Sequence, residues 1–524
     1  MAFIIDDESE RSSMSPPLRP TRRGALRLGA YGSALGAVGL TAGCGSAADA
    51  GDARALRIAQ KSEPAGLDPH LESGLDGMNV LINIFDTLTM RDADNELAPR
   101  LATSWEAVDE HRWRFHLRED VVFHNGEAFD AKSVKFSIER LIDPDTGSTI
   151  VELRSVDHVE IIDDHTVDIV MAEPDPVIPE KVSLFGGVML PSGYLEEVGA
   201  EEFAARPVGT GPFRFVSWRK AQLLRLEAND EHWNGRPAFD ELHFTAMPNA
   251  ASALAGIQSD VVDMVSALDP EAALQLEGYK DVALAKYPGI RMYFVVLDTE
   301  HEILRDVRVR RALNHAVDVP LLIEAVLNDS GREAATIVPQ EAFGYVPDIR
   351  PPERDQDLAR QLLAEAGHPD GIELRFTSSN KDRLLCEALA GMLGDVGVTL
   401  ELELLEPGTF AERLESEDPS SLGSMYLTGS TGWTLDGGAT LQSYIRSDRR
   451  RSRIRSESAD ALMDTIEQTV DPDTRLAALQ EMQQWLHDEA PFLFLYQADL
   501  DFATNGQITW EPNVNGTLAM ETAR

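Results

Sequence analysis

A continuous apolar run, Met292-Tyr-Phe-Val-Val-Leu297, constrains the fold of this chain most strongly. A strand with apolar side chains on both faces is typical of a sheet that other elements cover on both sides. A second apolar strand is predicted far along the chain, at Pro491–Tyr496. The chain is therefore expected to contain a buried sheet with helices packed against it, which is the architecture of an α/β protein.

The segments around these runs alternate between strand-like and helix-like patterns. Strands are predicted at 56–60, 113–118, 121–126, 159–171 (two strands), 213–218, 223–228 and 398–404. Helices are predicted at 79–88, 131–141, 250–257, 307–327, 359–366, 383–396, 459–470 and 473–489. Asp306 is the expected N-cap of the helix at 307–327, and Pro320 should divide that helix in two. This mixture of βα units and antiparallel hairpins predicts two α/β lobes rather than one sheet.

The N-terminal segment has the features of an export signal. Arg22 and Arg23 precede a weakly apolar run at 28–43, which is shorter than the roughly 20 residues that a membrane-spanning helix needs. Paired arginines before such a run resemble a twin-arginine signal, and Leu40-Thr-Ala-Gly-Cys44 resembles the lipobox of bacterial lipoproteins. We therefore expect an export signal at 1–43, lipidation of Cys44 and a flexible tether at 44–54. The alternative for Cys44 is a free cysteine in a tail.

The charge balance and the absence of known motifs exclude several functions. The 524 residues include 89 acidic and 47 basic side chains, a formal net charge of −42, and such a surface repels nucleic acid. No P-loop, G-x-S-x-G, H-E-x-x-H or C-x-x-C motif occurs, and the 12 histidines are scattered without ligand spacing. We therefore predict no catalytic centre, no metal site and no cofactor. Cys386 lies on a helical apolar pattern and is expected to be a small buried side chain.

One loop, Gly429–Thr440, combines glycines and hydroxyl residues with one large aromatic side chain and one carboxylate. Trp433 and Asp436 lie three residues apart in it. A loop that presents an indole and a negative charge could cover a ligand and neutralise a cation. The alternative is an ordinary surface turn with a partly buried tryptophan.

Several short stretches follow one another in the order of a known family. They are Leu101–Trp105, Phe115–Arg118, Phe123–Gly126, Ala131–Val134, Pro207–Phe213, Ala228–Pro237, Asp306–Leu313, Leu362–Gly367 and Asp471–Arg475. Together they resemble the family 5 extracellular solute-binding proteins, which include the dipeptide- and oligopeptide-binding components of ABC importers. The resemblance covers about residues 55–500.

The resemblance implies an α/β, two-lobed periplasmic-binding-protein (Venus-flytrap) fold that encloses a ligand between its lobes. It places the first lobe at 55–297 with an extra inserted subdomain at about 88–204, the second lobe at 298–491, and a return to the first lobe at 492–524. Met292–Leu297 and Pro491–Tyr496 are the candidate crossings. Ligand contacts in both lobes would favour the closed form, which transport partners recognise.

The resemblance also implies a ligand site. In peptide-binding members a W-x-x-D stretch supplies an aspartate to the free amino group of the peptide, and Trp433 and Asp436 match it, although Gly437–Thr440 replaces the Asp-Pro that often follows. A buried ammonium needs such a carboxylate to compensate its charge. The peptide backbone is expected to bind extended chain around Ser430–Trp433 and Ser62–Ala65. The candidate ligand-binding residues are Asp436, Trp433, Gly432, Ser430, Thr434, Glu63 and Arg383, the last for the ligand carboxylate.

The predicted function is the delivery of dipeptides or short oligopeptides to the permease and ATPase subunits of an ABC transporter. The body of the protein is expected to be a monomer outside the cytoplasm, in the periplasm or on the outer face of the cytoplasmic membrane, which it touches only through a lipid anchor. The same scaffold could serve a nickel chelate, an oligosaccharide or an opine. From other classes, an extracytoplasmic hydrolase and a structural or sensing lipoprotein are the alternatives.

Overall fold

The computed structural model describes residues 54–276 and 278–524. The predicted export signal with Arg22 and Arg23, the predicted lipidation site Cys44 and nearly all of the tether lie outside these residues. The described residues belong to one compact unit, Asp52–Arg524. None of its helices combines the length and the apolar character that a membrane span requires.

The largest sheet has eleven strands, of which ten form one hydrogen-bonded path. In spatial order they are β15 (Val398–Leu405), β14 (Ile372–Ser379), β16 (Met425–Thr431), β12 (Ala283–Leu297), β17 (Phe492–Thr504), β11 (Met264–Val265), β1 (Ala55–Gln60), β10 (Glu241–Ala246), β9 (Leu223–Ala228) and β8 (Phe213–Arg219). The eleventh strand, β13 (Gly331–Glu333), pairs with β17. The sheet mixes parallel pairs, such as β14 with β15, and antiparallel pairs, such as β8 with β9.

Two long strands, β12 and β17, connect the two ends of this path. They pair antiparallel over nearly their whole length, with an irregularity between Tyr287 and Arg291. β12 pairs with β16 only from Arg291 onward, whereas the other end of β17 pairs with β11. The prediction of two lobes rather than one sheet was therefore wrong in one respect. The two shared strands join both groups of strands into a single hydrogen-bonded path.

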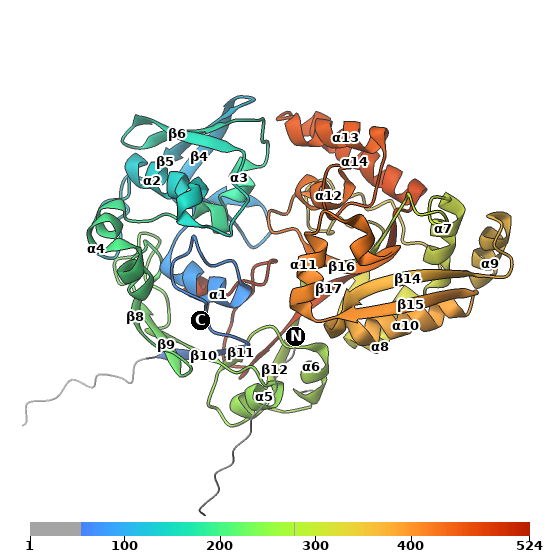
Figure 1. The fold of residues 1–524 in the computed structure, drawn as a ribbon. Coiled ribbons are helices and arrows are strands. Elements are labelled where there is room, and N and C mark those ends of the chain that lie inside the picture. Colours follow the sequence, from blue (N-terminus) through green and yellow to red (C-terminus); the bar gives the residue numbers. More distant parts are fainter. Residues whose placement is uncertain (1–53, 277) are drawn as a thin grey trace, which may run out of the picture. The chain divides into compact units, whose positions relative to one another are not determined.

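The apolar run of β12 is buried on both faces, as predicted. Val295 and Leu297 belong to one cluster of buried side chains, and Phe294 and Val296 to another. The first cluster includes residues of α7 (Val307–Ala316), α8 (Val319–Leu327), α9 (Gln356–Glu365) and α10 (Arg383–Gly394); the second includes residues of α12 (Gly437–Ile445), α13 (Glu457–Gln468) and α14 (Pro472–Glu489) (Figure 1). Met292–Leu297 was the predicted crossing between the lobes, but its buried side chains belong to clusters whose other members all follow it in the chain. If the chain forms two lobes, β12 therefore passes from one to the other at the irregularity at 287–291, before the predicted boundary at 297.

The helix boundaries follow the capping residues. The Asp306 carboxylate accepts a hydrogen bond from the backbone N–H of Arg308 at 2.9 Å and caps α7. Pro320 lies in the first turn of α8, so the prediction that it divides the helix at 307–327 is confirmed. The helix predicted at 79–88 was misplaced, because α1 begins at Leu75 and ends at Ile84. It stops there since the next residue, Phe85, adopts an extended conformation (φ −119°, ψ 148°).

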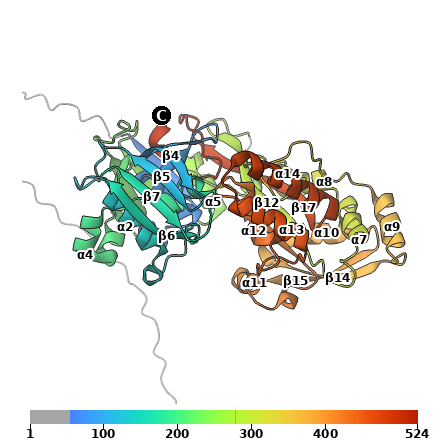
Figure 2. The same cartoon turned by 90° about the horizontal axis from the view of Figure 1, so that it is seen from above.

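A separate four-stranded sheet lies within the predicted insertion. Its spatial order is β4 (Ala102–Asp109), β5 (Arg112–Leu117), β7 (Thr166–Met171) and β6 (Val156–Asp163), all antiparallel. Helix α2 (Ala131–Ile142) packs on this sheet through β6 and β7 (Figure 2). The strand predicted at 121–126 is only a turn with an isolated bridge between Val122 and Ala128. The other elements of this half are β2 (Thr89–Arg91), β3 (Leu97–Pro99), α3 (Ile178–Lys181), α4 (Ser192–Ala205), α5 (Ala250–Gln258) and α6 (Pro270–Leu276).

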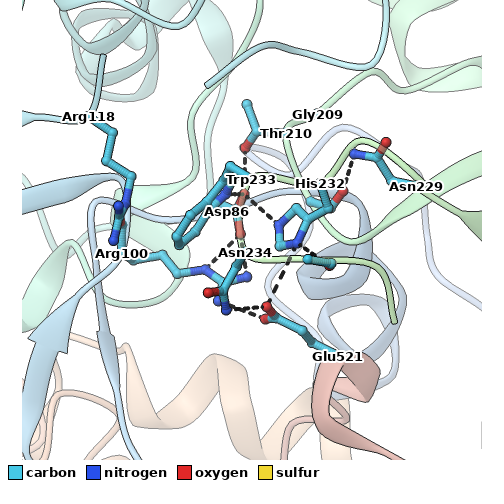
Figure 3. A network of polar contacts seen from close by, with 12 residues as sticks. Asp86, Arg100, Arg118, Gly209, Thr210, Asn229, His232, Trp233, Asn234 and Glu521 are labelled. Atoms are coloured by element: carbon cyan, nitrogen blue, oxygen red, sulfur yellow. Dashed lines mark hydrogen bonds and ion pairs between the residues drawn. The ribbon is translucent and has the colours of Figure 1, made fainter. Parts of the chain in front are cut away.

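A buried polar network explains two of the sequence motifs (Figure 3). Asp86 accepts hydrogen bonds from Arg100 Nε at 2.7 Å, from Thr210 Oγ1 at 2.9 Å and from Trp233 Nε1 at 3.0 Å. Arg100 also pairs with Glu521 at 2.7 Å. The stretches Pro207–Phe213 and Ala228–Pro237 therefore hold the chain together around one buried carboxylate, and the network includes the C-terminal residues.

Candidate functional site

The strand that leads into the predicted site, β16, has one free edge. It pairs with β12 along its whole length but with β14 only at Met425 and Tyr426. From Leu427 to Thr431, its other edge has no strand partner among the described residues. An unpaired strand edge offers its N–H and C=O groups to an added extended chain.

A tight turn follows this edge and presents the tryptophan. The Trp433 N–H donates to the carbonyl of Thr431 at 3.0 Å, and the Leu435 N–H donates to the carbonyl of Gly432 at 2.8 Å. Gly432 is required here because a Cβ would lie 2.7 Å from Thr440 Oγ1. The turn therefore depends on the glycine for close approach to α12.

Asp436 is a buried member of an ion pair. Its side chain is almost inaccessible, caps α12 through the backbone N–H groups of Gly438 and Ala439, and binds Arg475 with both oxygens at 2.6 Å. Arg475 is the last residue of the Asp471–Arg475 stretch. The alternative of an ordinary surface turn is therefore wrong, because 2% of Asp436 is exposed. Its role as the ammonium ligand stays a prediction.

The altered sequence after Asp436 has a steric reason. A Cβ on Gly438 would lie 2.9 Å from Arg475 Nη2 and 2.6 Å from the side chain of Ile466. Gly438 thus makes room for the guanidinium against α12, whereas a Cβ on Gly437 would approach the carbonyl of Phe343 at 3.0 Å. A larger residue at position 438 would collide with Arg475, so the glycine found there is compatible with the ion pair.

The turn touches the region of the predicted insertion. The Trp433 ring meets the ring of Phe185 edge-on, with centroids 5.6 Å apart and planes at 90°. Arg91, at the end of β2, donates through Nη2 to the carbonyl of Thr434 at 2.6 Å. These contacts bring chain from 89–91 and from 185 to the segment 433–434.

Unpartnered polar atoms gather around these contacts. Thr434 Oγ1, Thr440 Oγ1, Arg91 Nε and Glu180 Oε2 are buried and have no hydrogen-bond partner within the described part of the chain. Buried polar groups in folded proteins are nearly always paired. Four such atoms around one turn indicate a place where a polar ligand group or water completes the hydrogen bonding.

Two of the predicted site residues have other partners. Glu63 accepts hydrogen bonds from the backbone N–H of Ala221 at 2.7 Å and from Trp218 Nε1 at 3.4 Å, on the β8–β9 hairpin. Arg383 begins α10, is exposed and lies 3.6 Å from Glu387 one helical turn later. Ser430 lies on β16 opposite Met292, at the free edge. Five of the predicted site residues therefore lie in one segment at this edge: Ser430, Gly432, Trp433, Thr434 and Asp436. The hydrogen bonds of Glu63 and the ion pair of Arg383 go to residues outside that segment.

Sequence reasoning missed Arg291. Its guanidinium lies over the ring of Tyr293, and its Nε donates to the Tyr293 hydroxyl at 3.0 Å. A Cβ on Gly429 would lie 3.3 Å from this guanidinium, so the cation borders β16. Asp382 faces it: burial raises the pKa of Asp382, and Arg291 opposes that rise. The available signal was an arginine directly before the apolar run at 292–297.

Comparison with known proteins identifies the family. The model of the bacterial extracellular solute-binding proteins, family 5, matches residues 96–451. This chain belongs to that family. The family 5 assignment expected from the motifs is therefore confirmed. Members of this family are extracytoplasmic solute-binding proteins, and the family consists of binding proteins rather than enzymes.

Relatives of known name cover most of this family 5 chain. Heme-binding protein A of Haemophilus influenzae is 26% identical over 436 residues, which are 76% of this chain and 78% of the relative. The dipeptide-binding protein of Escherichia coli is 25% identical over 485 residues, 84% of this chain and 89% of the relative. The structure of HbpA2 from Haemophilus parasuis superposes with a TM-score of 0.82 at 23% identity and covers 90% of this chain and 99% of that one. The expected periplasmic-binding-protein fold is thereby confirmed.

Proposed function

We propose that this family 5 protein binds short peptides in an extended conformation along the free edge of β16 and delivers them to an ABC transporter. The unpaired edge from Leu427 to Thr431 carries this proposal, because it leads directly to Trp433 and Asp436. Main-chain hydrogen bonds to such an edge give affinity for any peptide sequence. The dipeptide-binding relative, similar over most of its length, supports the ligand class.

The two ends of the peptide have candidate partners. Asp436 would accept from the ammonium group, and Arg475 holds that carboxylate in place. Arg291, which borders the same strand, is our candidate for the carboxylate, in competition with Arg383. An ammonium left without a carboxylate in a site closed to water would be strongly disfavoured.

Lobe closure would couple binding to transport. The contacts of Trp433 with Phe185 and of Thr434 with Arg91 join the second half of the molecule to the predicted insertion. A ligand that touches both sides stabilises this joined arrangement and shifts the population toward it. The permease and ATPase subunits would then recognise the closed form. The irregularity of β12 at 287–291 is the proposed hinge.

Calorimetric titration tests the peptide proposal. We expect the dipeptide Met-Leu or tetra-alanine to bind saturably at one site, and N-acetyl-Met-Leu to bind much more weakly because it lacks the ammonium group. Arg291→Gln should weaken Met-Leu but leave Met-Leu-amide unchanged, whereas Arg383→Gln should change neither. If the purified protein binds hemin and neither free-amine peptide, the peptide proposal is wrong.

We also propose that the chain is exported through the twin-arginine signal at Arg22 and Arg23 and anchored through a lipid on Cys44. The order of paired arginines, mild apolar run and lipobox-like stretch supports this proposal. In a bacterial host, Cys44→Ser is expected to move the protein from the membrane fraction to the soluble fraction and to abolish incorporation of radiolabelled palmitate. Retention of the label in the variant would contradict lipidation at this cysteine.

A further inference from the structure

Among the residues that carry the four unpartnered atoms around the turn, Glu180 is the one with an acidic side chain. It lies on the short helix α3, which contacts β2 and the 185–187 turn. Its neighbour Lys181 forms an ion pair with Asp175, so the adjacent charges on this segment are satisfied. The Oε2 atom of Glu180 is inaccessible and has no donor within hydrogen-bonding distance in the described residues. A buried carboxylate oxygen without a donor is costly, because it has lost water and gained no replacement.

The charged groups that face Glu180 come from both sides of the Trp433–Phe185 contact. They are Asp436 and Arg475 on one side and Arg91 on the other. Neither arginine forms an ion pair with Glu180 among the described residues; Arg475 is already held by Asp436, and Arg91 donates to two backbone carbonyls. Burial, followed by repulsion from Asp436, raises the pKa of Glu180 to about 7. Glu180 and Asp436 therefore lie close enough to repel one another, and neither nearby guanidinium donates a hydrogen bond to Glu180 among the described residues.

We propose that Glu180 is a ligand-binding residue, and that it and Asp436 together hold one ammonium group of the ligand between the 178–187 segment and the 432–436 turn. An ammonium group has three donors. Glu180 Oε2 and the hydroxyl oxygens of Thr434 and Thr440 are acceptors without partners around that place. The positive charge also relieves the repulsion between the two carboxylates.

This inference rests on the proposed function and adds a requirement to it. If Asp436 alone binds the ammonium group, the ligand amine contacts only the 432–436 turn. With Glu180, the ammonium joins α3 to the turn and so binds only when the two segments are together. The protein should then select ligands with a free primary amine, and binding and closure should be one event.

The test compares Glu180→Gln with the wild-type protein by calorimetry at pH 7.5. The variant is expected to bind Met-Leu and tetra-alanine roughly 10- to 100-fold more weakly, which is the range of a hydrogen bond to a charged group. Binding of N-acetyl-Met-Leu should not change further. Glu173→Gln, which replaces an exposed carboxylate close by in sequence, is the matched control and should bind like wild type. Gln removes an unpaired buried charge, so the variant should fold at least as well as wild type.

Proton release is the second readout. With a pKa of about 7, Glu180 is partly protonated at pH 6.5 in the free protein, and a bound ammonium favours its ionised form. Wild-type protein should therefore release protons on binding Met-Leu at pH 6.5, measured in two buffers of different ionisation enthalpy, and bind more tightly at pH 7.5 than at pH 6. Glu180→Gln should release fewer protons and show a flatter profile.

The outcomes separate this inference from the function it rests on. Equal affinity and equal proton release in Glu180→Gln and wild type would overturn the role of Glu180 while leaving peptide binding intact. Weaker binding of acetylated and free-amine peptides alike would assign Glu180 to packing and also overturn the inference. Wild-type protein that binds neither free-amine peptide would overturn both proposals.

Discussion

Arg475→Ala is expected to lower the free energy of unfolding by about 3–5 kcal/mol, because it leaves the buried Asp436 carboxylate without its cation. Both oxygens of Asp436 lie 2.6 Å from the guanidinium, and the side chains are 7% and 2% exposed, so solvent screens the pair very little. Arg475 Nε also donates to the carbonyl of Ile466 at 2.8 Å, which ties α14 to α13. The variant therefore loses an ion pair and a link between two helices.

Urea unfolding measures this loss, and Arg360→Ala is the matched control. Arg360 pairs with Asp357 at 2.9 Å, but the Asp357 side chain is 99% exposed. Pairs of that kind contribute at most about 1 kcal/mol. If Arg475→Ala destabilises the protein no more than Arg360→Ala, water reaches Asp436 and the pair is not structural.

The same measurement determines how binding experiments on Asp436 should be done. Asp436→Ala is expected to weaken binding of a free-amine peptide by about 2–5 kcal/mol if the carboxylate holds the ammonium. It also removes the cap of α12 and leaves Arg475 buried beside Glu180. Asp436→Asn is the better variant, because its amide oxygen still caps the helix. Asp436→Asn still removes the negative charge that pairs with Arg475, so a binding loss at temperatures where the variant remains folded reports on the missing charge and not on the helix cap.

Asp86→Ala is expected to cost a similar amount of stability, about 3–5 kcal/mol, in the other half of the molecule. Burial alone would raise the pKa of Asp86, but Arg100 and the His232 and Trp233 side chains outweigh it and hold the pKa well below its usual range. The Thr210 hydroxyl, the Trp233 indole N–H and the guanidinium of Arg100 lose their acceptor in the variant. Leaving Arg100 with Glu521 as its remaining partner gives only partial compensation.

The matched control is Glu231→Ala, whose carboxylate is 79% exposed and lies 3.3 Å from Arg214. We expect that change to be within about 1 kcal/mol. Because the pKa of Asp86 is lowered on folding, its contribution is present above the unfolded pKa and is lost as the pH falls below it. The stability difference between wild type and Asp86→Ala should therefore shrink in acid; a difference that grows below pH 4 would contradict this assignment.

Local patterns predicted local features well. The cap at Asp306, the division at Pro320 and the doubly buried run at 292–297 each depend on residues close together in the sequence. The pairing of Asp436 with Arg475 and the approach of Glu180 to both depend on packing between distant segments. No periodicity reports such a contact. The motif at Asp471–Arg475 was visible, but nothing in its spacing connected it to the turn.

For the candidate site as well, the sequence predicted the local segment but not its contacts with distant parts of the chain. The segment from Ser430 to Asp436 stands at a free strand edge, because its neighbour β14 stops pairing at Tyr426. That fact depends on strand order, which the sequence does not carry. Glu63 was assigned as part of the extended segment Ser62–Ala65 and Arg383 as a cation for the ligand carboxylate, but both side chains bind other partners in the structure. Arg291 was overlooked because the neighbouring run at 292–297 was considered only as a buried strand, and its flanking residues were not examined as ligand contacts.

The pairing of β12 with β17 has a consequence for synthesis of the chain. Ala283 lies opposite Thr504, so β12 is synthesised long before the strand with which it pairs. Glu521, which completes the network around Arg100, emerges later still. Contacts of such high sequence separation fold slowly and leave strand edges exposed in the meantime. Between the synthesis of β12 and that of β17, the edge of β12 that pairs with β17 therefore stays open, and we expect aggregation of the nascent chain to be most sensitive to protection in that interval.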